Sequence, residues 1–258
     1  MKNKVLIIFK YPHDHWNIPV IDKFSNFYET EYLYISDYKN KNFADIVNDI
    51  NNLIKLKEID IVVFDVDYFK FINLFFIKRI NSKTKILITG DDFELHEMNA
   101  ITASGCDLVL CGCPLGVLKY QEKGFKAHFI TFEDGKAKEK YNEKKEIDVL
   151  FFGELTPDRK IILEHITKEG ISLKNVGHDD LIPSTPTKEL IKLISKSKIV
   201  INLSKTRTTT VKNYAAESIY RYYYQSKGRV FMAGINGSAC VSEISPGIEL
   251  LFTENEMP

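Results

Sequence analysis

Short apolar runs alternate with longer amphipathic stretches along the first half of the chain. The runs are rich in Val, Ile and Leu, which is typical of strands buried on both faces of a parallel sheet. We expect six strands, at residues 5–9, 31–35, 60–66, 85–89, 107–111 and 127–131. Helical patterns fall between them, at residues 43–57, 68–80, 94–103 and 115–123. This alternation predicts a doubly wound parallel sheet.

The second half repeats the alternation after a polar interval. Residues 133–146 are dense in charge and nearly devoid of apolar side chains, which favours a linker, with a solvated surface helix as the alternative. Beyond it we expect strands at 148–152, 172–176, 198–203 and 239–242, and helices at 158–168, 187–195 and 214–224. The sequence therefore predicts two Rossmann-like α/β domains, at residues 1–140 and 147–258, the second of them incomplete.

The balance of basic and acidic residues restricts the kinds of partner that the chain is expected to bind. The chain has 258 residues, with 35 Lys and Arg against 35 Asp and Glu, so its formal net charge is zero. A nucleic-acid-binding protein normally carries a basic excess or stripe, and we expect no nucleic-acid partner. A ligand that carries phosphate must then be held by a few local groups and not by a global field.

The cysteines and the N-terminus indicate a reducing compartment. Cys106, Cys111, Cys113 and Cys240 lie in or beside expected buried strands, so we predict reduced, structural thiols. The apolar run at the N-terminus is shorter than the 7–15 residues of a typical signal peptide, and no run approaches the ~20 residues of a membrane span. We therefore expect a cytoplasmic protein without a transmembrane segment, and peripheral membrane association stays open.

Several pieces of the second half occur in an order that resembles a known family. They are DVLFFG at 148–153 with Arg159 after it, NVG at 175–177, SKIVINL at 197–203, and GRVFMAGINGSACVSE at 228–243 with PGIE and LF following. Together they resemble the C-terminal domain of GT-B glycosyltransferases, above all the CgeB-like group of spore-maturation proteins, and more broadly the family 1-type C-terminal domain. The first half resembles these enzymes more loosely, through its strand order and the stretches at 90–92 and 112–114.

The resemblance implies a hexosyltransferase-like enzyme that moves a sugar from a nucleotide-diphosphate sugar to an acceptor hydroxyl. Such enzymes bind the donor mainly in the C-terminal domain. The acceptor, which is a saccharide, a lipid-linked molecule or a protein, binds mainly in the N-terminal domain across a cleft. They need no metal and no cofactor besides the donor substrate, because side chains and helix N-termini neutralise the diphosphate. In related sequences a Glu that binds the ribose hydroxyls commonly stands where this chain has Met232.

The candidate donor-binding residues follow strands of the second half. Arg229 is predicted to reach the diphosphate, because a guanidinium matches phosphate oxygens. Loops after two strands supply further N–H groups and cations. The full set is Gly153, Arg159, His178, Lys205, Arg207, Arg229, Ser242, Glu243 and Glu249. For each of these the ordinary alternative is a turn, a surface charge, a helix cap or a solvated loop.

The candidate catalytic residues belong to the first half. His13 and His15 lie in the expected loop after the first strand, which faces the cleft in GT-B folds, so either could be the general base toward an acceptor. Asp92, after the strand at 85–89, is the third candidate, and a helix cap is its ordinary alternative. We expect no metal site, because no third ligand accompanies the two histidines.

Two other functions stay open. One is a non-catalytic GT-B-like module that binds a nucleotide sugar. The other is a nucleotide-sugar epimerase on the same fold, which would need buried carboxylates and a histidine around the sugar. The match at 228–243 favours transfer.

Overall fold

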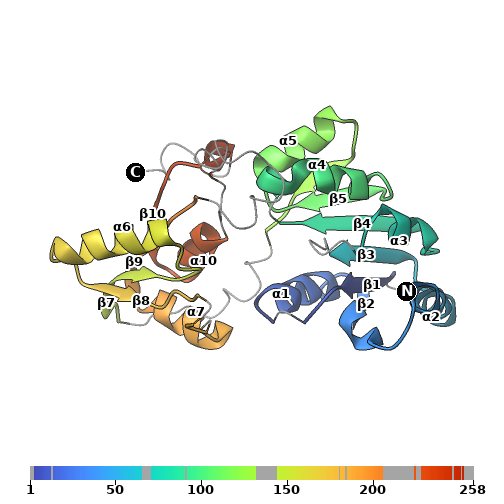
Figure 1. Ribbon diagram of the computed structural model, residues 1–258, viewed down its shortest axis with the longest axis horizontal. Helices are drawn as coiled ribbons and strands as arrows, with labels where there is room; N and C mark the ends of the chain where they lie inside the picture. The colour runs from blue at the N-terminus through green and yellow to red at the C-terminus, as the bar shows by residue number, and fades with distance from the viewer. Residues whose placement is uncertain are drawn as a thin grey trace. The chain divides into compact units, whose positions relative to one another are not determined.

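A computed structural model describes residues 3–12, 14–65, 71–90, 92–131, 144–179, 181–183, 185–205, 224, 228–245, 247–250 and 252, without the side chains of residues 14, 15, 93 and 94. The chain divides into two compact units, Met1–Phe132 with Leu250–Pro258, and Glu133–Glu249 (Figure 1). Most of the linker predicted at 133–146 lies outside the described residues.

The first unit contains a six-stranded parallel sheet of order β2-β1-β3-β4-β5-β6. Its strands are β1 (Lys4–Phe9), β2 (Glu29–Tyr34), β3 (Ile61–Asp65), β4 (Thr84–Thr89), β5 (Leu108–Cys111) and β6 (Ala127–Phe129). The helices between them are α1 (Asp14–Ser25), α2 (Phe43–Lys57), α3 (Leu74–Arg79), α4 (Asp92–Ala103) and α5 (Pro114–Glu122), with a 3₁₀ turn η1 (Ile35–Tyr38) after β2. The predicted doubly wound α/β sheet is confirmed.

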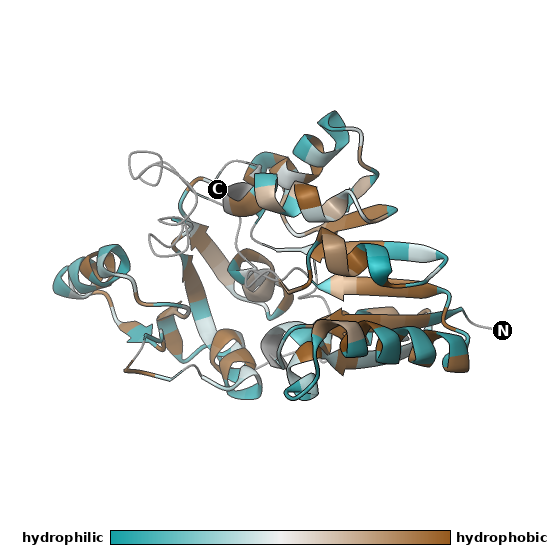
Figure 2. Ribbon diagram, turned by 45° about the vertical axis from the view of Figure 1, so that its right-hand side comes forward, coloured by the Kyte–Doolittle hydropathy of each residue, from teal (hydrophilic) through white to brown (hydrophobic). Residues whose placement is uncertain are grey.

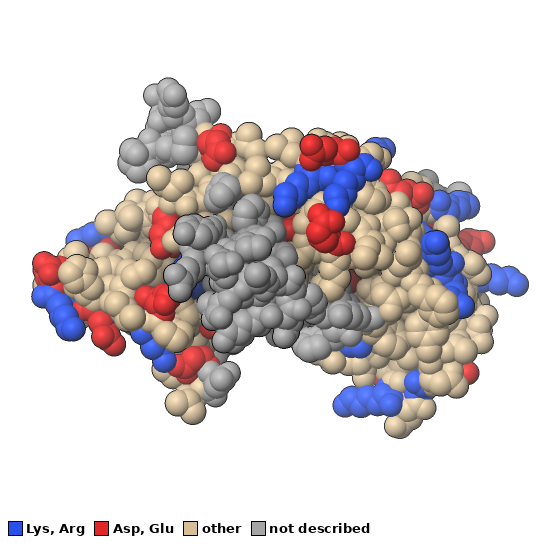
Figure 3. All heavy atoms as spheres, turned by 45° about the horizontal axis from the view of Figure 1, so that its top comes forward, with Lys and Arg blue, Asp and Glu red and all other residues tan. Residues whose placement is uncertain are grey.

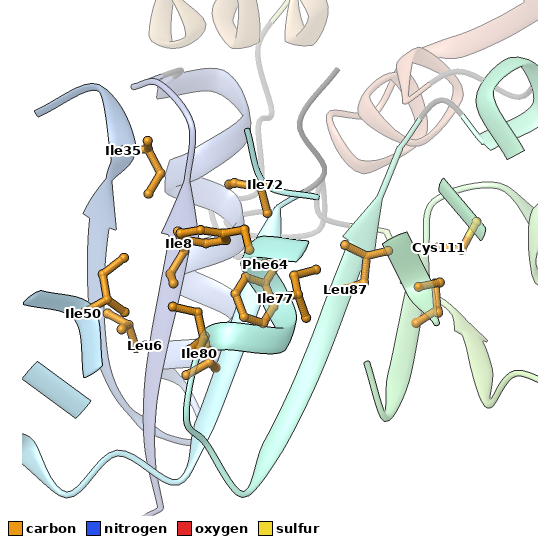
Figure 4. Close-up of a cluster of buried hydrophobic side chains, with 14 of the residues drawn as sticks. Leu6, Ile8, Ile35, Ile50, Phe64, Ile72, Ile77, Ile80, Leu87 and Cys111 are labelled. Atoms are coloured by element: carbon orange, nitrogen blue, oxygen red, sulfur yellow. The ribbon is translucent and has the colours of Figure 1, made fainter. Parts of the chain in front are cut away.

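Helices cover both faces of this sheet, which is why β1 is apolar from Val5 to Phe9. Leu6 and Ile8 point into a cluster formed with α2, α3, α4 and α5 (Figure 4). Val5, Ile7 and Phe9 point into the opposite cluster, which α1 completes. Successive side chains of a strand alternate between faces, so a continuous apolar run requires a cover on each side. The central strands of this sheet are accordingly brown along most of their length in Figure 2.

Helix α1 is an element that the sequence prediction missed. Asp14 and His15 were expected in a loop, and they are the first two residues of this helix. Pro19 lies inside α1, where it removes a backbone donor and normally argues against a helix. Among the described side chains of α1, only Val20 and Phe24 are apolar groups enclosed in the core, so the helical period of apolar residues is short.

The second unit contains a four-stranded parallel sheet of order β10-β9-β7-β8. Its strands are β7 (Ile147–Phe151), β8 (Leu173–Asn175), β9 (Ser197–Asn202) and β10 (Ala239–Ser242). Its helices are α6 (Pro157–Lys168), α7 (Thr187–Ser195) and α10 (Arg229–Ile235), and a 3₁₀ turn η2 (Ile248–Leu250) follows in the chain. Helices α7 and α10 pack on one face and α6 on the other, so this sheet too is doubly wound.

The described helices include neither the one predicted at 214–224 nor a membrane-spanning one. The helix predicted at 214–224 lies outside the described residues except for Tyr224. Within the described part of the chain, no helix has the length and apolar character to cross a membrane. Basic and acidic side chains alternate across the face shown in Figure 3, in keeping with a net charge of zero.

All four cysteines are free thiols, as the sequence predicted. Burial raises the pKa of Cys106 to about 12 and that of Cys240 to about 11. Burial also raises the pKa values of the Cys111 and Cys113 thiols, and the Asp92 carboxylate adds to the effect at Cys111. A thiol is nucleophilic only as the thiolate, so burial makes these four cysteines poor nucleophiles near neutral pH.

His96 of α4 carries an imidazole that is enclosed in the first unit. Its side chain is 3% exposed, and its ring lies against that of Tyr120, with 4.5 Å between centroids. Neither ring nitrogen is hydrogen-bonded within the described part of the chain. Desolvation by burial lowers the pKa of His96 below its ordinary value of 6.5, outweighing the opposite effect of Asp92. The folded protein therefore favours the neutral imidazole.

Acidification is expected to destabilise the protein through His96. Below pH 6.5 the unfolded state takes up a proton on this residue while the folded state resists it, so the free energy of unfolding falls with pH until the folded pKa is reached. Urea midpoints at pH 7.5 and 5.5 measure the slope. We expect the stability of the His96→Phe variant to depend less on pH, because it lacks the contribution of His96. An equal pH dependence in the two proteins would show that His96 does not cause it.

Candidate functional site

The carboxyl ends of β7 and β9 form the natural ligand position of the second unit. In its sheet β7 is the first strand in sequence, with β8 on one side and β9 on the other. The helical connections therefore leave β7 toward opposite sides, and open α/β sheets bind ligands beyond the carboxyl ends at such a switch point. Gly153 follows β7 there, and Leu203 follows β9.

Arg229 spans this switch point. It is the first residue of α10, and its Nη2 donates to the Leu203 carbonyl after β9 at 2.8 Å. Its Nη1 donates to the Phe152 carbonyl after β7 at 3.3 Å, and its Nε donates to Oδ1 of Asn202 at 3.0 Å. The residue is partly exposed. A positive charge is thus fixed between two neighbouring strand ends, where a diphosphate-binding group was expected.

Gly153 is required by the position of Arg229. Its φ is 116°, a backbone conformation that side-chain-bearing residues rarely adopt. A Cβ at this position would overlap Nη1 of Arg229. The sequence identified this glycine from its place after a strand, and the structure shows that the close approach comes from the protein's own guanidinium.

Asn202 is the centre of the polar network, and sequence reasoning missed it. Its side chain is fully buried at the end of β9. Its Nδ2 donates to the hydroxyl oxygens of Ser204 and Ser242, at 3.1 and 2.8 Å, while its Oδ1 accepts from Arg229. A buried polar side chain is stable only with its partners in place, so Asn202 fixes β9, β10 and α10 together. The one signal in the sequence was a polar residue at the end of an apolar strand.

Glu243 occupies the position that the sequence analysis reserved for phosphate. The donor-rich loop after β9 was a candidate for holding a diphosphate, with a solvated loop as the alternative. In the structure the Ser204 and Lys205 amides donate to Oε2 of Glu243, at 2.6 and 3.2 Å. The Glu243 carboxylate is therefore an anion that the protein itself supplies, and its hydrogen bonds order this loop.

Arg159, a predicted donor-binding residue, is enclosed between the two strand-end loops. Its side chain is 4% exposed. Its guanidinium donates to the main-chain carbonyls of Glu154, Leu203 and Lys205, at 2.8, 3.1 and 3.0 Å. Its guanidinium thus positions the two strand-end loops, and donor binding by Arg159 stays a prediction.

The other predicted donor residues lie around the same edge or outside the described residues. His178 is partly exposed. Its main-chain N–H donates to the Gly153 carbonyl at 2.9 Å, which joins it to the loop after β7. Lys205 pairs with Asp158 through its ammonium group. Glu249 accepts from the Gly247 amide at 3.1 Å, which is local to its own turn. Arg207 lies outside the described residues.

Met232 stands where related sequences commonly have a ribose-binding Glu, and its side chain packs in the core of the second unit. It packs against a buried apolar cluster of the second unit, which includes Leu150, Ile194 and Val200. Within the described residues, no group of three or more His, Cys, Asp or Glu side chains could hold a metal ion.

Of the predicted catalytic residues, only Asp92 has a described side chain. His13 lies outside the described residues, and so does the side chain of His15. Asp92 is fully buried at the start of α4, and its carboxylate accepts hydrogen bonds from four donors. They are the Tyr120 hydroxyl (2.7 Å), the Asn99 amide (2.9 Å), the Cys111 thiol (3.0 Å) and the Thr89 hydroxyl. These partners give Asp92 a structural role in the first unit, and its role as an acceptor-side base stays a prediction.

Comparison with known proteins supports the fold. No protein-family model matches the chain, and no curated protein matches it. A Listeria monocytogenes protein assigned as a UDP-N-acetylglucosamine 2-epimerase is similar with a TM-score of 0.51 and 11% identity, over 78% of this chain and 74% of that one. The UDP-GlcNAc 2-epimerase of Methanocaldococcus jannaschii is similar with a TM-score of 0.52 and 9% identity, over 96% and 86%. The chain has the two-sheet Rossmann-like architecture of the GT-B type.

Proposed function

We propose that this chain is an enzyme that acts on a nucleotide-diphosphate sugar, with the diphosphate held at the carboxyl ends of β7 and β9. The observation that carries the proposal is the Arg229 guanidinium, fixed by three acceptors at the switch point of that sheet. A guanidinium pairs with phosphate oxygens and stabilises the charge that develops on a diphosphate. The position also agrees with ligand binding at the switch points of other open α/β sheets.

Epimerisation at C2 of the sugar is our first candidate for the reaction. It is favoured because the two solved structures named above, from Listeria monocytogenes and Methanocaldococcus jannaschii, carry that assignment. Transfer to an acceptor hydroxyl is the second candidate, favoured by the sequence pattern at 228–243. His13 and His15 remain the proposed proton-transfer groups for either reaction, because imidazole titrates near neutral pH.

Titration calorimetry with UDP and UDP-N-acetylglucosamine tests the binding site. We expect saturable binding that Arg229→Gln weakens at least tenfold, about 1.4 kcal/mol. Arg79→Gln, on α3 of the first unit, is the matched control and is expected to bind as the unaltered protein does. If neither ligand binds at millimolar concentration, or if both variants bind equally well, the proposal is wrong.

Incubation with UDP-N-acetylglucosamine in heavy water, without an acceptor, separates the two reactions. Inverting C2 breaks and remakes a C–H bond, so an epimerase produces the C2 epimer with deuterium at that carbon. Transfer breaks only the bond between the sugar and the diphosphate, so a transferase leaves C2 protonated and needs an added acceptor. Mass spectrometry and proton NMR of the sugar read out the difference.

A further inference from the structure

Strand β2 forms one edge of the sheet of the first unit. It pairs with β1 on one side, and among the described residues no strand pairs with its other side, at the lower margin of this sheet in Figure 1. An edge strand presents a row of main-chain donors and acceptors that another strand can complete. Strand β2 is six residues long, from Glu29 to Tyr34, so this edge is long enough to pair with a further strand.

Every second residue of β2 directs its main-chain groups outward. The Glu29 N–H donates to the Asn3 carbonyl on the β1 side, at 3.1 Å. The main-chain groups of successive residues point to opposite sides of a strand, so those of Thr30, Tyr32 and Tyr34 are directed away from β1. Within the part of the chain that the structure describes, the main-chain groups of Thr30 and Tyr32 have no partner on that side.

An exposed aromatic side chain marks the centre of this edge. Tyr32 is 51% exposed, and its ring lies 5.7 Å from that of Tyr34, centroid to centroid. A groove of about 700 Å³ begins beside Tyr32 and is lined further along by Tyr38, Lys39 and Lys41. Edges that stay in water usually carry lysine or proline at such positions, whereas tyrosine is enriched in the contacts between proteins.

The charges at the two ends of β2 favour a second copy of this chain as the partner. Glu29 begins the strand, and Lys39 follows its carboxyl end after the η1 turn; both are exposed. Neither forms an ion pair with any other described residue. When two such strands lie antiparallel, the acidic end of each lies beside the basic end of the other, so the edge is complementary to itself.

The register centred on Tyr32 pairs the most groups. With Tyr32 opposite Tyr32 of the partner subunit, position 30 lies opposite position 34, so all the outward-facing residues form hydrogen-bonded pairs. A register centred on Glu31 would set two carboxylates directly opposite each other, which is destabilising. One centred on Leu33 would leave the outward groups of Thr30 unpaired.

We propose that two copies of this chain associate through β2, in antiparallel register across a two-fold axis at Tyr32. The two six-stranded sheets then form one continuous sheet, and the two tyrosine rings lie side by side as a cross-strand pair. Such a contact is closed, because the same surface of each copy meets its equivalent. The proposal does not depend on the nucleotide site of the second unit.

Sedimentation velocity of the full-length protein at micromolar concentrations tests the association. We expect a species of twice the 29.8 kDa mass of the chain. Tyr32→Lys places a charge at the centre of the interface and leaves the main chain of β2 in place, so the dissociation constant of the dimer is expected to rise at least tenfold.

Leu118→Lys is the matched control, because Leu118 is also 51% exposed but lies on α5, beside β5 and β6 at the other end of the sheet. It is expected to dimerise as the unaltered protein does. A protein that stays monomeric at every concentration, or an equal effect of the two lysines, overturns the proposal.

Two cysteine variants test the register without adding charge to the edge. In the proposed pairing the Cα atoms of the two Tyr32 residues lie about 5.5 Å apart, within reach of a disulfide. The two Thr30 residues lie more than about 13 Å apart, beyond that reach. With oxidised glutathione we expect Tyr32→Cys to give a covalent dimer on a non-reducing gel, and Thr30→Cys to give no more than the unaltered protein. Equal cross-linking of the two variants, or none of Tyr32→Cys, overturns the proposed pairing.

Discussion

Replacing Asp92 with alanine is expected to lower the free energy of unfolding by about 3–5 kcal/mol. The carboxylate is fully buried and accepts from four donors on α4, α5, β4 and β5. Its removal leaves the hydroxyls of Thr89 and Tyr120 and the amide of Asn99 without this acceptor in the core. A domain is stable by only about 5–15 kcal/mol, so the loss is a large fraction of the total. Urea unfolding followed by circular dichroism measures it.

Two variants locate the effect. Asp92→Asn keeps the shape but turns one acceptor into a donor, so we expect an intermediate loss. Glu97→Gln changes a carboxylate on the same helix whose side chain is 81% exposed and pairs with Lys123 at the surface, so little change is expected. An Asp92→Ala protein as stable as the Glu97→Gln protein would show that the buried network does not hold the first unit together.

The strands were predictable because their environment leaves a direct mark on the sequence. A strand covered on both faces is apolar through its middle, and the middle residues of β1, β3 and β4 meet that condition. Helix α1 was missed for the opposite reason. It contains Pro19 and contributes few enclosed apolar side chains, so its local sequence does not favour a helix. Packing against the sheet stabilises the helix instead.

The candidate site was predictable only in part, because position after a strand can be inferred from sequence and burial cannot. Arg229 and Gly153 were identified by their places in the pattern, and both lie at the switch point. Arg159 was identified in the same way, but it is enclosed and donates to main-chain carbonyls. Asn202 was overlooked, because its role depends on partners as far along the chain as Arg229 and Ser242.

The same reasoning holds for Glu243 and Asp92. A carboxylate near a strand end is a candidate for catalysis or ligand binding until its partners are known. Glu243 accepts from two amides and Asp92 from four side chains, so each is committed to the protein. The hydrogen-bonding partners, which come from distant parts of the chain, separate structural from functional carboxylates.

Gly153→Ala is expected both to destabilise the second unit and to weaken nucleotide binding. At a φ of 116° an alanine carries backbone strain of about 1–3 kcal/mol, and its Cβ would overlap the guanidinium of Arg229. Arg229 must then move from the strand ends, so we expect the dissociation constant for UDP to rise at least tenfold. Thermal unfolding and titration calorimetry give the two readings.

Gly170→Ala separates backbone strain from displacement of Arg229. Gly170 follows α6 with a φ of 81°, and a Cβ there would meet nothing within 4 Å. It shares the unfavourable backbone conformation with Gly153 but lies against no guanidinium. We therefore expect Gly170→Ala to lower the melting temperature and leave UDP affinity unchanged. If both variants lost affinity alike, the loss would follow from reduced stability, and the placement of Arg229 over Gly153 would not be what holds the diphosphate.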